Sequence, residues 1–253
     1  MMITLHEQNK NYQADLSRPL DISVPIQAGN KNPSCYGADP VRIETIESGD
    51  FVGSVEKGGS VNHQKLTITP HGNGTHTECV GHILADRTAT ITQCLTSFHS
   101  LALVISVSPE RSSSGDQVIT KKILQEKLKG PVSTSLVIRT LPNSEAKKSR
   151  HYTGTNPPYL ESDAVAFLVR NGVQHLLIDL PSLDPEVDGG KLAAHKAFWN
   201  WPNEIRRNST ITELVYISDT IPDGLYLLNL QIISLEMDAS PSKPILYKLT
   251  EVL

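Results

Sequence analysis

The chain has 253 residues, enough for one large domain with its own core or for two small ones. Its 23 Lys and Arg residues against 27 Asp and Glu residues give a net charge of -4, which offers no attraction for nucleic acid or an anionic membrane. No apolar run approaches the roughly 18 residues needed to span a bilayer.

Short aliphatic segments along the chain predict the strands of a buried core. Leu66 and Ile68 alternate with polar residues, as in a half-buried strand. Later aliphatic runs, bounded by polar residues or proline, are typical of buried strands, and they lie at 101–107, 135–141 and 175–180. Helices are predicted between and after these runs, at 120–129, 162–171 and 192–199. The alternation of strand and helix indicates an α/β protein, with a partly antiparallel layer added by strands toward both ends of the chain.

The last third of the chain predicts further strands. Apolar residues alternate through 228–237 with a shift of one residue midway, which predicts a β-bulge, and 245–253 predicts a final strand. Two polar segments are expected to be exposed loops, 109–117 and 142–158. Neither resembles a long linker, so we expect one domain over residues 1–253.

The cysteines and the start of the chain bear on its compartment. Cys35, Cys79 and Cys94 form no Cys-x-x-Cys pair, which argues against zinc ribbons and thioredoxin-type sites. The chain turns polar at once after its first residues, unlike a secretory signal. We therefore expect a reduced, cytoplasmic protein.

The densest group of chemically active side chains lies between residues 70 and 82. Within twelve residues of a Gly-rich stretch, the sequence places Glu78 among three histidines, His71, His76 and His82. Imidazole nitrogen and carboxylate oxygen are ligands that zinc or manganese prefers. In an extended segment His76 and Glu78 share one face, because side chains alternate with period two. The spacing alone leaves a metal site and a solvated histidine loop as equal alternatives.

Other catalytic motifs do not fit this chain. The triplet from His76 to Glu78 matches half of the zinc nucleoside deaminase motif, but the Pro-Cys-x-x-Cys half is absent from the sequence. The sequence also lacks a Gly-x-Ser-x-Gly nucleophile elbow and a phosphate-binding Gly-rich loop followed by Lys. Asp179 and Asp184 flank a Pro-Ser turn, where capping is the expected role.

The same segment resembles the signature H-x-G-T-H-x-D-x-P-x-H of the cyclase family of metal-dependent hydrolases, which includes bacterial kynurenine formamidase and isatin hydrolase. The residues from Gly74 to His76 match G-T-H, Glu78 takes the Asp position, and His82 matches the last His. Further similarity follows in the family's order along the chain, at 15–20, 137–140, 177–185, 194–196 and 212–214.

The resemblance implies a mixed, barrel-like β-core with flanking helices (a swivelling β/β/α fold), a homodimer, and one or two zinc or manganese ions. It implies His82 as the general acid and base. The metal ligands that it implies are His71, His76, Glu78, His195 and Glu213. Tyr36 lies near the family's substrate-side loop, and Trp199 is a candidate for the substrate pocket or for a subunit interface.

Two positions depart from the family pattern. The family's first His lies four residues before His76, where this chain has Gly72, and His71 is one position early. Because a one-residue slip turns a strand residue to the opposite face, His71 reaches the metal only if Gly72 lies in a bulge or kink. Glu78 also extends its carboxylate by about 1.5 Å relative to Asp. The two changes either compensate, which we favour, or mark a degenerate site.

The favoured hypothesis is an enzyme that hydrolyses a C–N bond of a small amide. The candidate substrates are an aryl formamide such as N-formylkynurenine and a cyclic amide or imide, with metal-activated water as the nucleophile and His82 carrying a proton to the leaving nitrogen. A non-catalytic small-molecule-binding protein on a degenerate cyclase scaffold is the alternative. A zinc lyase or dehydratase is a third possibility.

Overall fold

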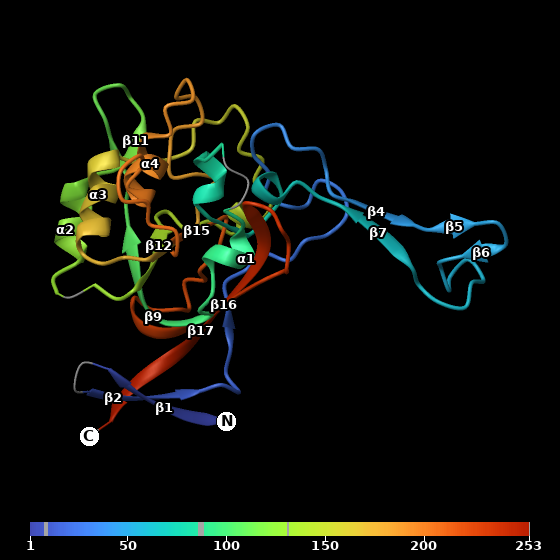
Figure 1. Ribbon diagram of the computed structural model, residues 1–253, viewed down its shortest axis with the longest axis horizontal. Helices are drawn as coiled ribbons and strands as arrows, with labels where there is room; N and C mark the ends of the chain where they lie inside the picture. The colour runs from blue at the N-terminus through green and yellow to red at the C-terminus, as the bar shows by residue number, and fades with distance from the viewer. Residues whose placement is uncertain (8–9, 86–88, 131, 253) are drawn as a thin grey trace.

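The computed structural model describes residues 1–7, 10–85, 89–130 and 132–252. Its centre is a mixed barrel of seven strands in the order β17-β16-β9-β12-β14-β15-β8, closed by pairing of β8 with β17 (Figure 1). Four neighbours are parallel: β9 (His99–Val107), β12 (Ser135–Thr140), β14 (His175–Ile178) and β15 (Thr210–Glu213). The others pair antiparallel: β8 (His76–Glu78), β16 (Gly224–Ile232) and β17 (Ala239–Val252). The expected barrel-like mixed core is therefore confirmed.

The parallel strands form the most deeply buried part of the barrel. Every residue of β12 and β14 is buried, in keeping with the continuous aliphatic runs that predicted them. Three helices lie together on one side of these strands: α2 (Lys121–Lys127), α3 (Ser162–Arg170) and α4 (Ala193–Trp199) (Figure 1). All three were expected within a few residues of these bounds. A four-residue helix, α1 (Ile91–Cys94), had no predicted counterpart.

The strand expected around Leu66 is present, but its environment differs from the prediction. Among the described residues, strand β7 (Gln64–Thr67) pairs only with β4 (Arg42–Thr45), in an arm that extends away from the barrel (Figure 1). Beyond them the arm holds a second hairpin, β5 (Glu47–Ser48) with β6 (Phe51–Val52). The expected half-buried strand is wrong, since Leu66 is 51% exposed. The alternating pattern has no core to face, because the arm lies off the barrel.

The β-bulge expected within 228–237 is also wrong. Strands β16 and β17 pair in unbroken register from Tyr226 with Lys248 to Ile232 with Ser242. The shift in the apolar pattern marks the end of β16 and the start of the turn at 233–238. The shift in the apolar pattern therefore indicates where the strand ends, and not an inserted residue.

Smaller elements complete the fold. The N-terminal hairpin of β1 (Met2–Glu7) and β2 (Lys10–Asp15) extends the sheet along β17, and β3 (Leu20–Asp21) also pairs with β17. The segments expected to be loops contain short structure. The segment 109–117 contains β10 (Glu110–Arg111) and the first residue of β11 (Gln117–Ile119), and these two strands pair. Strand β11 also pairs with β13 (Tyr159–Leu160). The segment 142–158 contains the 3-10 helix η3 (Glu145–Ser149). Lys147 in η3 is buried, so 142–158 is not uniformly exposed as expected.

Candidate metal centre

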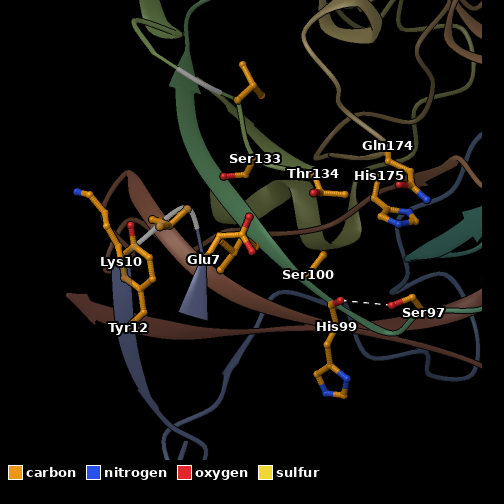
Figure 2. A pocket seen from close by; sticks show the side chains of 13 residues that line it. Glu7, Lys10, Tyr12, Ser97, His99, Ser100, Ser133, Thr134, Gln174 and His175 are labelled. Atoms are coloured by element: carbon orange, nitrogen blue, oxygen red, sulfur yellow. Dashed lines mark hydrogen bonds between the residues drawn. The ribbon is translucent and has the colours of Figure 1, made fainter. Parts of the chain in front are cut away.

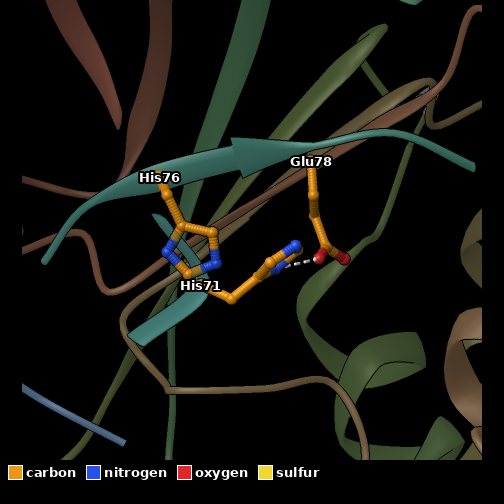
Figure 3. Close-up of side chains that lie close together, drawn as sticks. All are labelled: His71, His76 and Glu78. Atoms are coloured by element: carbon orange, nitrogen blue, oxygen red, sulfur yellow. Dashed lines mark ion pairs between the residues drawn. The ribbon is translucent and has the colours of Figure 1, made fainter. Parts of the chain in front are cut away.

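Strands β8 and β15 bring three of the predicted site residues together. His76 is the register partner of Glu213, and its Nε2 lies 3.4 Å from Glu213 Oε2. Glu78 follows two residues later on β8, and Figure 3 shows its side chain on the same side of the strand as His76. All three side chains are almost fully buried. The expectation that His76 and Glu78 share one face is confirmed.

His71 reaches the same cluster from a turn and not from the strand. It lies in the 3-10 helix η1 (Pro70–Gly72), and its Nδ1 is 3.1 Å from Glu78 Oε2 (Figure 3). The turn packs so tightly that a Cβ on Gly72 would lie 2.3 Å from Ala38 Cβ. The kink that the displaced histidine requires is therefore present at Gly72.

His195 joins the cluster from the first turn of α4. Its Nε2 is 3.1 Å from Glu78 Oε1, and its Nδ1 is 2.5 Å from Asp184 Oδ2. The Asp184 carboxylate also accepts hydrogen bonds from the backbone N–H groups of Ala194 and His195, at 2.7 and 3.0 Å. Asp184 therefore caps the start of α4, ten residues along the chain from its own Pro-Ser turn, and the same carboxylate orients the His195 ring. Asp179, for which capping was also expected, instead accepts from Thr140 and Lys147.

His82 lies at the edge of the cluster. It sits in the 3-10 helix η2 (Val80–Ile83), with Nδ1 3.9 Å from Glu78 Oε2. The same nitrogen is 3.3 Å from Oδ2 of Asp238, a residue in the turn between β16 and β17. The His82 side chain is 29% exposed, whereas those of His76 and Glu78 are at most 1% exposed. It can therefore exchange protons with solvent while it faces the buried carboxylate.

A buried nitrogen without a partner shows that this cluster fits a metal ion. His76 Nδ1 donates to the carbonyl oxygen of Gly74 at 3.0 Å, which leaves Nε2 directed at Glu213. Among the described residues, His76 Nε2 has no hydrogen-bond partner, and Glu78 Oε1 has only its ion-pair contact with His195 Nε2 at 3.1 Å. Leaving a buried polar group unsatisfied costs about 1–3 kcal/mol, so such atoms are expected to have a partner.

In His71, His76 and His195, the ring nitrogen that points away from the cluster also has a hydrogen-bond partner. The acceptors are the Gly74 carbonyl for His76, Asp184 for His195, and Asp238 for His71, whose Nε2 is 2.8 Å from Asp238 Oδ2. Metal-ligating histidines almost always donate their second N–H in this way. Candidate ligand atoms of His71, His76 and Glu78 lie within 4.8 Å of one another, as do those of Glu78, His82 and His195.

Protons supply the positive charge that the cluster needs in its metal-free form. Burial disfavours the imidazolium of His71, but hydrogen bonds to Asp238 and Glu78 outweigh burial and raise its pKa to about 10. His195 is likewise buried, and Asp184 and Glu78 raise its pKa to about 10. Burial opposes ionisation of Glu78, yet His82, His195 and His71 hold its pKa well below the usual range. A divalent cation would replace these protons, because metal binding requires neutral imidazoles.

A cavity of about 240 Å³ opens beside the cluster. Its walls include five residues of the cluster, together with Tyr36, Leu192 and Glu186; the five are His71, Glu78, His82, His195 and Glu213. Tyr36 therefore lies where substrate contact was expected. Trp199 does not line this cavity, because its side chain is fully buried. The centroids of the Trp199 and His195 rings lie 5.6 Å apart, and Trp199 Nε1 donates to the Ser209 carbonyl oxygen. The structure places Trp199 behind His195, and its burial contradicts a role in substrate contact or at an exposed interface.

A larger cavity, about 570 Å³, is lined by residues at the starts of β9 and β14 (Figure 2). Lys10 and Tyr12 of the N-terminal hairpin and His175 at the start of β14 contribute to its walls. None of the residues of the histidine-carboxylate cluster lines it. We therefore take the smaller cavity as the functional one, because it alone of the two combines a recess with converging buried ligands.

The sequence did not indicate that Asp238 contacts His71 or that Asp184 orients the His195 ring. Asp238 follows an irregular apolar stretch and belongs to no motif, and only the return of the chain through β17 places it beside His71. Asp184 was visible as part of a Pro-Ser turn, but its contact with His195 depends on how α4 docks.

A closed mixed barrel with a buried histidine-carboxylate cluster at its mouth defines a class of candidate metalloproteins. The chain belongs to the cyclase family, whose model, described as "Putative cyclase", matches residues 14–185. Within the described residues, no helix is both long and apolar enough to cross a membrane.

Several known proteins are similar over nearly the whole chain. A kynurenine formamidase of Bacillus cytotoxicus is 30% identical over 233 residues, covering 92% of this chain and 95% of that protein. One from Bacillus cereus is 29% identical, covering 90% and 96%. Isatin hydrolase A from Ralstonia solanacearum has a TM-score of 0.65 at 15% identity, covering 92% of each chain. A predicted metal-dependent hydrolase from Bacillus stearothermophilus has a TM-score of 0.62 at 17% identity, covering 91% and 98%. At these identities the two solved structures support the fold alone.

Proposed function

We propose that the protein is a metal-dependent hydrolase that cleaves the C–N bond of an aryl formamide, such as N-formylkynurenine of tryptophan catabolism, or of a cyclic amide or imide. The observation that carries this proposal is the unpartnered buried nitrogen His76 Nε2 beside the buried carboxylates of Glu78 and Glu213, in a cluster of oriented histidines. The kynurenine formamidases that are about 30% identical support the aryl formamide. The fold shared with isatin hydrolase makes a cyclic amide the second substrate to test.

In this proposal each side chain of the cluster has a role. His71, His76, His195, Glu78 and Glu213 would hold the cation, and the two oxygens of Glu78 face different histidines, which suits one ion or two. A bound divalent metal would polarise the amide carbonyl and lower the pKa of a water molecule, so that this water could attack the carbonyl carbon at neutral pH. His82, partly exposed at the rim, delivers a proton to the leaving nitrogen as the C–N bond breaks. A formamide would thus yield formate and the free amine.

The alternative of a degenerate binding scaffold rested on the missing first histidine and on the Glu for Asp exchange. His71 of η1 lies 3.1 Å from Glu78, and Glu78 also lies 3.1 Å from His195. These contacts support the hypothesis that the two departures compensate and that the site is competent. Incorporation of oxygen from labelled water into the product separates hydrolysis from the third possibility, a lyase or dehydratase.

The test combines elemental analysis of the purified protein with turnover of N-formylkynurenine. We expect at least one equivalent of metal per chain. His76→Ala should lose both metal and turnover, whereas His82→Ala should lose turnover and keep its metal. His63→Ala on the exposed arm is the matched control and should change neither. Less than about 0.1 equivalent of metal after supplementation, or wild-type turnover in His76→Ala, would refute the proposal.

Two finer proposals concern the metal and the compartment. The ligand set contains nitrogen and oxygen but no thiolate, which supports zinc or manganese. Metal titration of the metal-free protein, with each ion alone, would distinguish them. Cys35, Cys79 and Cys94 are all buried and free, which supports a reducing cytoplasm. Cell fractionation tests that location.

We also propose that the protein is a homodimer. An arm projects from the barrel (Figure 1). It exposes several apolar side chains, among them Phe51 at 40%, Val55 at 55% and Leu66 at 51%. A second copy covering this surface would remove it from water. Light scattering after size exclusion should give twice the chain mass of 27.7 kDa, and Phe51→Asp with Leu66→Asp should shift it toward one chain. A monomer at micromolar concentration would contradict this assignment.

A further inference from the structure

We infer that Asp238 is a positioning residue of the metal centre: its carboxylate fixes the ring of the out-of-register ligand His71 and joins that ring to His82. The inference rests on the proposed metal site, but it concerns a residue outside the family motif. Asp238 comes from the turn between β16 and β17, about 160 residues after the histidines that it touches.

One oxygen of Asp238 serves both rings. Oδ2 is 2.8 Å from His71 Nε2 and 3.3 Å from His82 Nδ1. The two rings lie with their centroids 4.3 Å apart, tilted by 36°. With its Nε2–H donated to Asp238, His71 turns Nδ1 toward Glu78, and the tautomer that suits a metal ligand is fixed. Asp238 thereby links the ligand to the residue that transfers protons.

The carboxylate is held in place by the backbone around it. The Asp238 carbonyl oxygen accepts from the N–H of Cys79, adjacent to Glu78, at 2.9 Å, and the Met237 carbonyl accepts from Ile91 at 2.7 Å. On the other side of the turn, the Glu236 carboxylate accepts from the hydroxyls of Thr90 and Thr92. The turn is thus tied to the strand that carries the ligands and to α1.

His71 needs such a partner more than the other ligands do. His76 lies on a paired strand and His195 on a capped helix, so their backbones are fixed by regular hydrogen bonding. His71 lies on a three-residue turn, and its side chain is 25% exposed. A ligand placed one position early on a short turn depends on a side-chain contact for its orientation, and Asp238 supplies that contact.

The test measures zinc binding without substrate. Asp238→Ala should raise the zinc dissociation constant, measured by chelator competition, about 10- to 100-fold, the usual effect of removing an outer partner of a ligating histidine. Asp238→Asn should have a smaller effect because its amide oxygen still accepts from His71. Saturating zinc should restore the wild-type stoichiometry in both. The visible spectrum of the cobalt-substituted protein should change in both variants. Glu126→Ala, which removes an exposed carboxylate on α2, away from the cluster, is the control and should match the wild type.

Each outcome decides the inference. If Asp238→Ala binds one zinc equivalent per chain fewer than the wild type at saturating zinc, Asp238 is a ligand and the positioning role is overturned. A wild-type dissociation constant and cobalt spectrum in Asp238→Ala would also overturn it. If Asp238→Ala does not fold by circular dichroism, Asp238→Asn and Asp238→Glu provide the same comparison. Because no substrate is involved, a failure of every amide to be hydrolysed would refute the proposed function and leave this inference standing.

Discussion

Gly72 is the position where a single methyl group should test the architecture of the metal centre. An added Cβ would meet Ala38 Cβ at 2.3 Å, whereas ordinary contacts begin near 3.4 Å. Something must therefore move by about 1 Å, and the other two neighbours, Cys35 O and Thr69 Cγ2, are already at 3.4 Å. The turn η1 bears His71, a proposed metal ligand whose Nδ1 lies 3.1 Å from Glu78 Oε2, so the displacement acts directly on that side chain.

We expect Gly72→Ala to destabilise the protein by about 1–3 kcal/mol, the usual cost of overpacking. For a chain of this size each kcal/mol lowers the melting temperature by about 2–4 °C. Metal affinity should fall as well, because a ligand displaced by about 1 Å no longer matches the coordination distance. Calorimetry with and without zinc, together with chelator competition, measures the two effects separately.

The neighbour that causes the clash also offers the control. Ala38→Gly removes the Cβ nearest to the added methyl, so the double variant Ala38→Gly with Gly72→Ala should recover most of the lost metal affinity. Gly130→Ala is the matched neutral change, because a Cβ there meets nothing within 4 Å. Wild-type stability and zinc affinity in Gly72→Ala, or no recovery in the double variant, would refute the packing argument.

Two further predictions concern stability away from the centre. Burial, aided by the charge of Arg206, lowers the pKa of His175 from 6.5 to about 4. The unfolded chain therefore binds more protons between these values, and His175 should contribute up to about 3 kcal/mol that is present above pH 6.5 and lost as the pH falls to 4. Urea unfolding at pH 7 and pH 4.5 measures this slope, and an equally steep slope in His175→Gln would contradict it. Lys147→Met should cost about 3–5 kcal/mol in urea unfolding at pH 7, since Lys147 Nζ lies 2.7 Å from the buried Asp179 carboxylate. The double variant Lys147→Met with Asp179→Asn should recover part of the lost free energy of unfolding. A cost below about 1 kcal/mol in Lys147→Met would show that the ion pair does not stabilise the fold.

Local pattern determined much of the barrel. The aliphatic runs at 135–141 and 175–180 predicted β12 and β14, because strands covered on both faces are apolar throughout. The helix expected at 162–171 was found because its apolar face recurs with helical period. The same patterns could not report what lies beyond the strand. Leu66 alternates like a core residue, yet its strand belongs to an exposed arm.

The sequence by itself determined which residue types were available to the centre and that His76 and Glu78 share a face, because a strand fixes the direction of neighbouring side chains. Only the tertiary structure decided that His71 reaches Glu78 from a kinked turn, that Trp199 is buried behind His195, and that Asp238 faces the cluster. These placements depend on contacts between segments as much as 167 residues apart, such as His71 with Asp238. Spacing along a chain constrains directions within an element, whereas the approach of one element to another is set by barrel closure and packing.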